Sequence, residues 1–252
     1  MKTDAFKDHF SGHASAYADA RPHYPPELFT WLAMLSPQHE LAWDCGTGNG
    51  QAAVALTAHY RRVIATDASA QQIKLAFQHP QVEYRTAPAE HSGLAAHSVD
   101  LVTVAQAAHW FDLPAFYAEV RRVVKPGGAV VLWCYGLCRI APEVDAVVNR
   151  FYAGETDAYW PPERRLVDAS YRTLPFAFPE IGAPSMHMRQ IWNLAQFLAY
   201  LSTWSGVQRF IKQTGRDPIP ALASELSGVW DVPEEVRDVV WPLYFRVGQV
   251  TG

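Results

Sequence analysis

The residues best placed for chemistry are one aspartate and three glycines within a short stretch of the chain. Asp44 ends an apolar run, and Gly46, Gly48 and Gly50 follow it at alternate positions. Because glycine has no side chain, the backbone there can approach a ligand closely. A helix expected over 52–60 would offer free N–H groups and partial positive charge at its start. This combination suits a ligand that carries a carboxylate, an ammonium group and a nucleoside.

A second acidic residue, Asp67, ends the next predicted strand, which covers 62–67. An acid about 20 residues after a glycine-rich turn is placed to accept hydrogen bonds from both hydroxyls of a ribose. The alternative is that Asp67 caps a helix expected over 71–77, because aspartate is a good N-cap. Ser69 is better placed for that cap, which would leave Asp67 to the ligand.

The spacing of the glycines separates two kinds of nucleotide site. A dinucleotide fingerprint needs G-x-G-x-x-G, and a Walker A loop needs G-K-[ST]. The stretch from Asp44 to Gly50 instead reads D-x-G-x-G-x-G. This pattern resembles the signature loop of class I S-adenosylmethionine-dependent methyltransferases. The resemblance implies S-adenosylmethionine as the cofactor and S-adenosylhomocysteine as the product formed from it.

Later segments extend the resemblance. A strand expected from Val82 is followed by a loop with Ala89 and Glu90, and in this family that loop lies near the adenine edge. Glu90 is equally well explained as a solvated loop acid. A helix over 113–124, the run Lys-Pro-Gly-Gly and a strand over 129–133 also match the family's pattern. The resemblance implies these cofactor-binding residues: Asp44, Gly46, Thr47, Gly48, Asn49, Gly50, Gln51, Asp67, Ala68, Ser69, Ala89, Glu90, Gln106 and Ala107.

A nearly continuous apolar run over 98–105 predicts a strand buried on both faces of a parallel sheet. Gln106, Ala107, His109 and Trp110 follow it, and ligands bind at the carboxyl ends of such strands. We expect these residues to border the transferred methyl group, and the Q-A-x-H-W segment matches the family. His109 is the candidate catalytic base, needed only by an acceptor with a proton to lose. The alternative is a structural hydrogen bond.

A narrower resemblance covers the N-terminal segment, 10–26. It reads F-x-x-H-A-x-x-Y-x-x-x-R-P-x-Y-P and is similar to the opening of a type 11 branch related to trans-aconitate methyltransferases. The resemblance implies that Tyr17 and Arg21 close over the cofactor, with Arg21 near its carboxylate. A guanidinium offers a planar fork for such a group. The alternative is an ordinary surface helix in which Arg21 pairs with a protein acid.

Strands and helices are expected to alternate over 41–132, which predicts βαβ units and a parallel sheet. The family resemblance implies an α/β, Rossmann-like fold. It has seven mostly parallel strands in the order 3-2-1-4-5-7-6, helices on both faces and a helical lid. The last two strands, 185–192 and 241–247, would then form an antiparallel hairpin.

We expect a single methyltransferase domain over 1–252. It would comprise an N-terminal helical segment over the cofactor (1–35), a cofactor-binding core (36–138), and lid helices with the last two strands (139–252). The pattern of apolar residues predicts further helices over 142–152, 194–204, 207–214, 219–226 and 233–239.

The narrower resemblance implies methylation of an oxygen on a small carboxylic acid. Three arginines in or near the predicted lid are open alternatives as its partner: Arg139, Arg164 and Arg189. Large aromatic residues usually belong to the core, but several side chains are candidate substrate-binding walls: His23, Trp110, Tyr135, Trp160 and Trp204. A protein acceptor stays open, and a nicotinamide-dependent dehydrogenase is disfavoured by the glycine spacing.

Composition narrows the class of protein. The 252 residues carry a formal net charge of −4 with a pI near 6.2 and no basic run, which disfavours nucleic acid as a partner. No apolar run is long enough for a membrane, and 1–8 lack the core of a signal peptide. Three cysteines form no C-x-x-C pair, and ten histidines show no metal-binding spacing. We therefore expect a cytoplasmic enzyme that acts on a small molecule without a metal; the sequence does not specify the oligomeric state.

Overall fold

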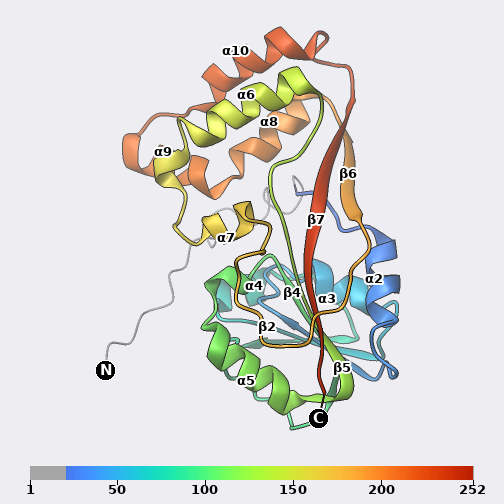
Figure 1. Ribbon diagram of the computed structural model, residues 1–252. Helices are drawn as coiled ribbons and strands as arrows, with labels where there is room; N and C mark the ends of the chain where they lie inside the picture. The colour runs from blue at the N-terminus through green and yellow to red at the C-terminus, as the bar shows by residue number, and fades with distance from the viewer. Residues whose placement is uncertain (1–20, 252) are drawn as a thin grey trace.

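A seven-stranded sheet organises the computed structural model, which describes residues 21–251 (Figure 1). Its strand order is β3-β2-β1-β4-β5-β7-β6, which confirms the order expected from the sequence. The strands are β1 Leu41–Cys45, β2 Arg62–Asp67, β3 Val82–Thr86, β4 Val99–Ala105, β5 Val124–Tyr135, β6 Met186–Trp192 and β7 Arg237–Gln249.

The first five strands pair in parallel, and the last two pair antiparallel with their neighbours. β1 lies between β2 and β4, and β7 lies between β5 and β6 as the expected hairpin. Because neighbouring parallel strands point the same way, the carboxyl ends of β1 to β5 meet at one edge of the sheet. Ligands of open α/β sheets bind at this edge, next to the point where the strand order reverses.

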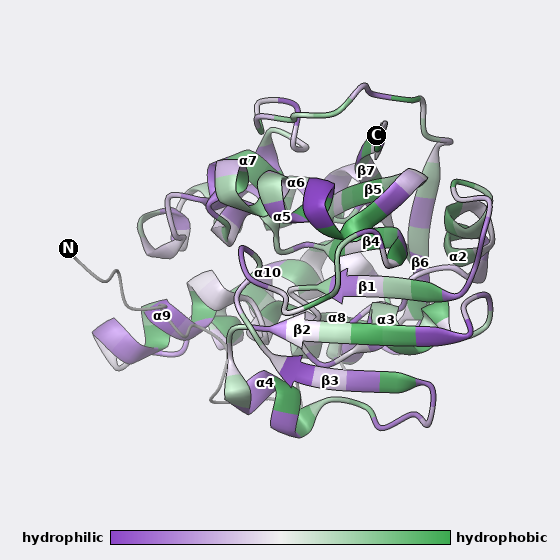
Figure 2. Cartoon of the chain, turned by 90° about the horizontal axis from the view of Figure 1, so that it is seen from below, coloured by the Kyte–Doolittle hydropathy of each residue, from purple (hydrophilic) through white to green (hydrophobic). Residues whose placement is uncertain are grey.

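Side chains that alternate along the strands build a core on each face of the sheet. In β4, Leu101 belongs to one cluster, whereas Val102 and Val104 belong to the other. In β2, apolar residues lie between hydrophilic ends, as Figure 2 shows. The alternation follows from the two-residue period of a strand. Strands buried on both faces therefore hold the carboxyl edge in a fixed position.

The helices fall into two groups. Those around the sheet are α2 Pro26–Ala33, α3 Gln51–Leu56, α4 Ala70–Leu75 and α5 Leu113–Val123, with a short 3-10 helix η1 Ala108–Trp110. Those after β5 are α6 Pro142–Ala153, η2 Asp157–Tyr159, α7 Arg164–Asp168, α8 Leu194–Ser202, α9 Ser205–Thr214 and α10 Ile219–Trp230.

Helices α6, α8, α9 and α10 gather at the end of the molecule toward which β6 and β7 extend (Figure 1). We call these four helices the lid. Phe197 of α8 stacks on Trp230 of α10 with ring centres 5.7 Å apart. The indole N–H of Trp241, in β7, donates to Tyr200 Oη of α8 at 3.0 Å. The lid therefore shares a continuous apolar core with one face of the sheet.

The structure corrects one predicted helix and moves several predicted boundaries, among them the start of β5. The helix expected over 233–239 is absent from the described chain, because β7 already begins at Arg237 and pairs there with Trp192. Val239 becomes fully buried in that hairpin, which stabilises the strand over a short helix. The Lys-Pro-Gly-Gly run does not separate helix from strand either, because α5 ends at Val123 and β5 starts at the next residue.

No helix within 21–251 is both long and apolar enough to cross a membrane. In the same part of the chain, no group of three or more His, Cys, Asp and Glu side chains comes together as metal ligands would. The three cysteines are buried and unpaired.

Candidate functional site

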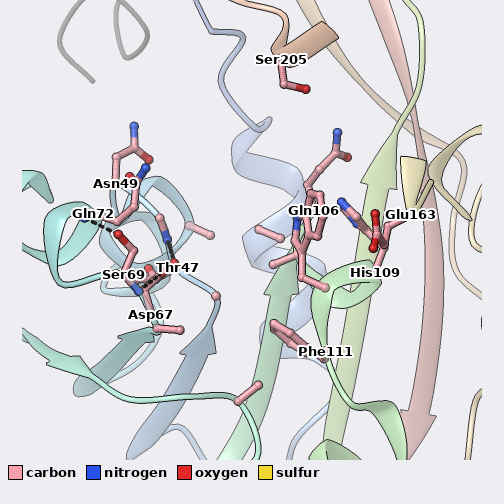
Figure 3. A pocket seen from close by; sticks show the side chains of 18 of the residues that line it. Thr47, Asn49, Asp67, Ser69, Gln72, Gln106, His109, Phe111, Glu163 and Ser205 are labelled. Atoms are coloured by element: carbon pink, nitrogen blue, oxygen red, sulfur yellow. Dashed lines mark hydrogen bonds between the residues drawn. The ribbon is translucent and has the colours of Figure 1, made fainter. Parts of the chain in front are cut away.

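A cavity of about 1030 Å³ opens at the carboxyl ends of the strands, between the sheet and the lid. Its floor, as we use the word, consists of the residues supplied by 46–52, 67–72, 87–91 and 105–115. Its roof consists of the residues supplied by 135–137, 160–164 and 200–205. Figure 3 shows Thr47, Asn49, Asp67 and Ser69 on one side and Gln106, His109, Phe111 and Glu163 on the other, with Ser205 of the roof above.

Most of the predicted binding residues line this one cavity, although they come from separate segments. From the floor these are Gly46, Thr47, Gly48, Asn49, Gln51, Asp67, Ala68, Ser69, Ala89, Glu90, Gln106, Ala107, His109 and Trp110; Arg21, Tyr135, Trp160 and Trp204 complete the set. Asp44, Gly50 and His23 do not line it. Tyr17 lies outside the described residues.

Asp44 lies under the glycine turn, fully buried. Its two oxygens accept hydrogen bonds from Thr47 Oγ1 at 2.6 Å and Thr103 Oγ1 at 2.7 Å. Burial raises the pKa of its carboxyl group to about 6, and the two threonine hydroxyls oppose that rise. The structure thus shows Asp44 fixing the turn from below, and direct contact with a ligand stays a prediction.

Two glycines of the turn serve different purposes: one allows close packing and the other leaves the cavity open. Both have positive φ, +68° at Gly46 and +56° at Gly48, a region that other residues rarely adopt. A Cβ at Gly46 would lie 2.5 Å from Ala107 Cβ, so this glycine allows the turn to pack on the end of β4. A Cβ at Gly48 would meet no atom within 4 Å, so this position faces open cavity.

Asp67 is held at the end of β2 by backbone groups. Its carboxylate accepts the N–H of Gly48 at 2.9 Å and the N–H of Ser69 at 2.8 Å. Ser69 is the N-cap of α4 and accepts the N–H of Gln72 at 3.3 Å. The cap is therefore Ser69, as expected, and Asp67 lies against the cavity (Figure 3). A carboxylate oxygen can accept more than one hydrogen bond, so these two bonds are compatible with a ligand hydroxyl.

Gln106 has a role that its sequence position did not reveal. Its φ is +56°, unusual for a residue with a side chain. Its Oε1 accepts the N–H of Tyr135 at 2.6 Å, and its Nε2 donates to the carbonyl of Tyr135 at 3.1 Å. Tyr135 Oη in turn accepts Arg21 Nη1 at 3.0 Å. The amide therefore joins the ends of β4 and β5 and indirectly positions Arg21.

His109 lies in η1, with its Nδ1 2.8 Å from the hydroxyl of Tyr171. Burial, and then the positive charge of Arg164, lower the pKa of His109 to about 3. The imidazole is therefore neutral at physiological pH. Tyr171 is fully buried and has a positive φ of +57°. It was not predicted as a partner, because 62 residues separate it from His109.

The roof is lined by aromatic rings, and it carries Arg164, the second arginine of the cavity besides Arg21. Tyr200 and Trp204, both of which line the cavity, have rings 6.0 Å apart and nearly perpendicular. Arg164 lies 4.9 Å from the centre of the Trp160 ring and also lines the cavity. Tyr200 is a lining residue that the sequence did not single out. His23 instead contacts the floor from outside, where its Nδ1 lies 3.0 Å from Gln51 Nε2.

Known proteins resemble this chain over nearly its whole length. A protein of Dictyostelium discoideum named as a methyltransferase is 35% identical over 246 residues, which cover 95% of this chain and 94% of that protein. A family model described as "Methyltransferase domain" matches residues 43–132. The chain belongs to the class I S-adenosylmethionine-dependent methyltransferases.

Solved structures agree with this methyltransferase family. A structure described as that of a Type II methyltransferase from Anaeromyxobacter dehalogenans is 47% identical. It aligns with a TM-score of 0.86 and covers 92% of this chain and 98% of its own. A methyltransferase structure from Anabaena variabilis, 18% identical, has a TM-score of 0.53 over 88% of this chain and 98% of its own, and shows the shared fold alone.

The floor of this methyltransferase fits S-adenosylmethionine. The bare backbone at Gly48 leaves room for a ligand, and Asp67 offers carboxylate oxygens at a distance along the chain typical of ribose recognition. Arg21 lines the same cavity and supplies a cation suited to a carboxylate. A ribose and a carboxylate tail would need groups of these kinds, and the binding roles of Asp67 and Arg21 stay predictions.

Proposed function

We propose that this methyltransferase binds S-adenosylmethionine on the floor of the cavity and methylates an oxygen of a small carboxylic acid below the roof. S-adenosylmethionine supplies an electrophilic methyl group on a sulfonium. Asp67 would bind the ribose, Arg21 the carboxylate tail, and the loop with Ala89 and Glu90 would border the adenine. The resemblance of the N-terminal segment to trans-aconitate methyltransferases is consistent with an acid as acceptor.

The observation that carries this proposal is the contrast in charge within the cavity. The floor presents the carboxylates of Asp67, Glu90 and Asp112, whereas the roof presents the guanidinium of Arg164, next in sequence to the carboxylate of Glu163, among aromatic rings. A cationic donor suits the floor, and an anionic acceptor suits the roof. Methyl transfer to a carboxylate neutralises both charges, so a site with little water favours it.

His109 supports an acceptor that needs no base. Its pKa, lowered to about 3, makes it a weak proton acceptor. A carboxylic acid is already ionised at neutral pH, because its pKa is near 4. We infer that His109 stays neutral through turnover and contacts the acceptor without taking a proton. Alignment of the acceptor oxygen with the methyl group, within about 3–3.5 Å, would contribute roughly 7–11 kcal/mol.

Calorimetry tests the cofactor. We expect S-adenosylhomocysteine to bind and NAD to give no heat of binding. Binding of NAD with no response to S-adenosylhomocysteine would contradict the proposal.

An acceptor screen with radiolabelled methyl donor tests whether the acceptor is a carboxylic acid. Small carboxylic acids, phenols and primary amines are compared at the same concentration and pH. We expect label in base-labile methyl esters. Label found in ethers or methylamines, with none in esters, would exclude a carboxylate as the acceptor.

A further inference from the structure

The sequence left three arginines open as partners of an acceptor carboxylate, and the structure separates them. Arg189 forms two hydrogen bonds with Asp238, at 2.7 and 2.6 Å, on the exposed outer side of the β6–β7 hairpin. Arg139 is exposed and pairs through its backbone with Val240. Neither residue lines the cavity, whereas Arg164 does.

One end of the Arg164 guanidinium is anchored. Its Nε donates to the hydroxyl of Tyr152 at 3.0 Å and to Asp168 Oδ1 at 3.2 Å. Within residues 21–251, neither of its terminal amino groups donates a hydrogen bond. The side chain is 17% exposed and lines the cavity. An anchored guanidinium of this kind can present its remaining donors to a planar oxyanion.

Aromatic rings fix the plane of that guanidinium. Its central carbon lies 4.9 Å from the centre of the Trp160 ring and 5.5 Å from that of Tyr152. Trp160 in turn donates its indole N–H to Thr156 Oγ1 at 3.1 Å. The other support of Trp160 is Gly206 in α9, where a Cβ would lie 2.6 Å from the ring. Trp160, predicted as a wall of the substrate site, therefore also supports Arg164.

The charged residues around the cavity can pair with only one carboxylate of the acceptor. The charged residues that line it, apart from its two histidines, are Arg21, Arg164, Asp67, Glu90, Asp112 and Glu163. Arg21 donates to Tyr135 and is the proposed partner of the cofactor's own carboxylate. A second acceptor carboxylate would meet acidic side chains or aromatic rings, and an unpaired charge in such surroundings is costly.

We propose that Arg164 binds the acceptor's carboxylate, and that the acceptor is a monocarboxylate with an apolar body that contacts Tyr200, Trp204 and Leu137. This inference rests on the proposed function and names its substrate class. It assigns Trp160 and Gly206 as positioning residues that act through Arg164. Di- and tricarboxylates are excluded as good acceptors by the absence of further cationic side chains among the described lining residues.

The test compares acceptors and then variants. With wild-type enzyme and labelled methyl donor, we expect aryl- and alkyl-monocarboxylates such as benzoate and phenylacetate to exceed citrate and trans-aconitate in kcat/KM. Arg164→Gln should raise the KM for the best monocarboxylate by about 10- to 100-fold, because a charge-assisted pair is lost. Arg164→Lys keeps the charge but loses the planar pair of donors, so its acceptor KM should lie between those of wild type and Arg164→Gln.

The control is Arg165→Gln, which removes the exposed neighbouring arginine of the same short helix. We expect its KM and kcat to match wild type. Gly206→Ala should raise the acceptor KM about 10-fold by displacing Trp160, while the dissociation constant of S-adenosylhomocysteine stays unchanged. That split distinguishes a positioning role from general loss of structure, which would weaken both ligands.

Each outcome separates the inference from the proposed function. If S-adenosylhomocysteine does not bind wild type, the proposed function fails. If methyl esters form but Arg164→Gln leaves the acceptor KM unchanged, the assignment of Arg164 is wrong and the proposed function stands. If a tricarboxylate proves the best acceptor, the restriction to one carboxylate is overturned.

Discussion

The floor and the roof of the cavity are built in different ways. The floor centres on a compact part of the chain, 46–72, in which a glycine turn and Asp67 line the cavity and the buried Asp44 holds the turn from below. The roof uses residues from the end of β5, from 160–164 up to the first residue of α7, and from 200–205, which join α8 to α9. The matching family model covers the floor and stops at residue 132.

If the floor binds the cofactor and the roof binds the acceptor, as we propose, the two surfaces should respond differently to substitution. A surface made by the backbone tolerates substitution of neighbouring side chains, provided that the turn keeps its conformation. A surface made by side chains on lid helices changes with each substitution. We therefore expect variants of the floor segments 46–52 and 67–72 to alter cofactor affinity alone, and roof variants to alter acceptor kinetics alone.

The largest difference between the effect on cofactor affinity and the effect on the acceptor KM is expected for Asp67→Ala. The variant removes the proposed acceptor of the ribose hydroxyls and the hydrogen bonds that the carboxylate accepts from Gly48 and Ser69. We expect the dissociation constant of S-adenosylhomocysteine to rise about 100-fold, measured by calorimetry. At saturating cofactor the acceptor KM should stay within a factor of about two. A similar rise in the acceptor KM would show that floor and roof are not independent.

Asp44→Asn tests whether burial raises the pKa of the carboxyl group beneath the glycine turn. Burial raises the pKa of Asp44 to about 6, so the native state holds a proton that the unfolded chain releases near pH 4. Its contribution to stability is therefore largest below pH 4 and is lost as the pH rises through 6. The unfolding free energy of the variant minus that of wild type should increase by about 2–3 kcal/mol from pH 4 to pH 7.

Urea unfolding at the two pH values measures this difference directly. Other carboxylates titrate in both proteins and cancel in the subtraction. A difference that does not change with pH, or that changes in the opposite direction, would contradict the raised pKa.

Gly48→Ala and Gly215→Ala form a matched pair. Both glycines have positive φ, +56° and +71°, and at both a Cβ would meet no atom within 4 Å. Each alanine should cost about 1 kcal/mol of stability through backbone strain. Only Gly48 lines the cavity, so only its variant should bind S-adenosylhomocysteine more weakly, by about 10-fold. Equal affinities would remove Gly48 from the cofactor's path.

The smallest effect is expected for His109→Gln. A general base contributes about 10²–10⁴-fold to a rate, whereas a neutral histidine beside a carboxylate acceptor contributes much less. We expect kcat to fall by no more than about threefold, and the rate of both proteins to be flat from pH 6 to pH 8. A rate that rises with pH in wild type but not in the variant would assign the histidine a proton-transfer role. A hundredfold lower kcat of the variant would do the same.

Particular residues show where prediction from the sequence succeeded. The strand order, the hairpin of β6 and β7, the cap at Ser69 and the gathering of 46–49 with 67–69 were all expected. The helix over 233–239 was wrong, because hairpin pairing outweighed its helical pattern. Gln106 was predicted to bind the cofactor and border the methyl group; it lines the cavity, and the sequence did not predict that both polar atoms of its amide bond the backbone of Tyr135.

The sequence by itself determined the floor, because the conformation of a glycine turn and the positions of two strand-terminal acids depend on neighbours within a few residues. Only the tertiary structure decided which arginine faces the cavity, that Tyr171 meets His109, and that Gly206 seats Trp160. Those contacts join residues 46 to 62 positions apart in two of the three cases. They depend on how lid helices pack on a sheet, and short-range sterics carry no information about that packing.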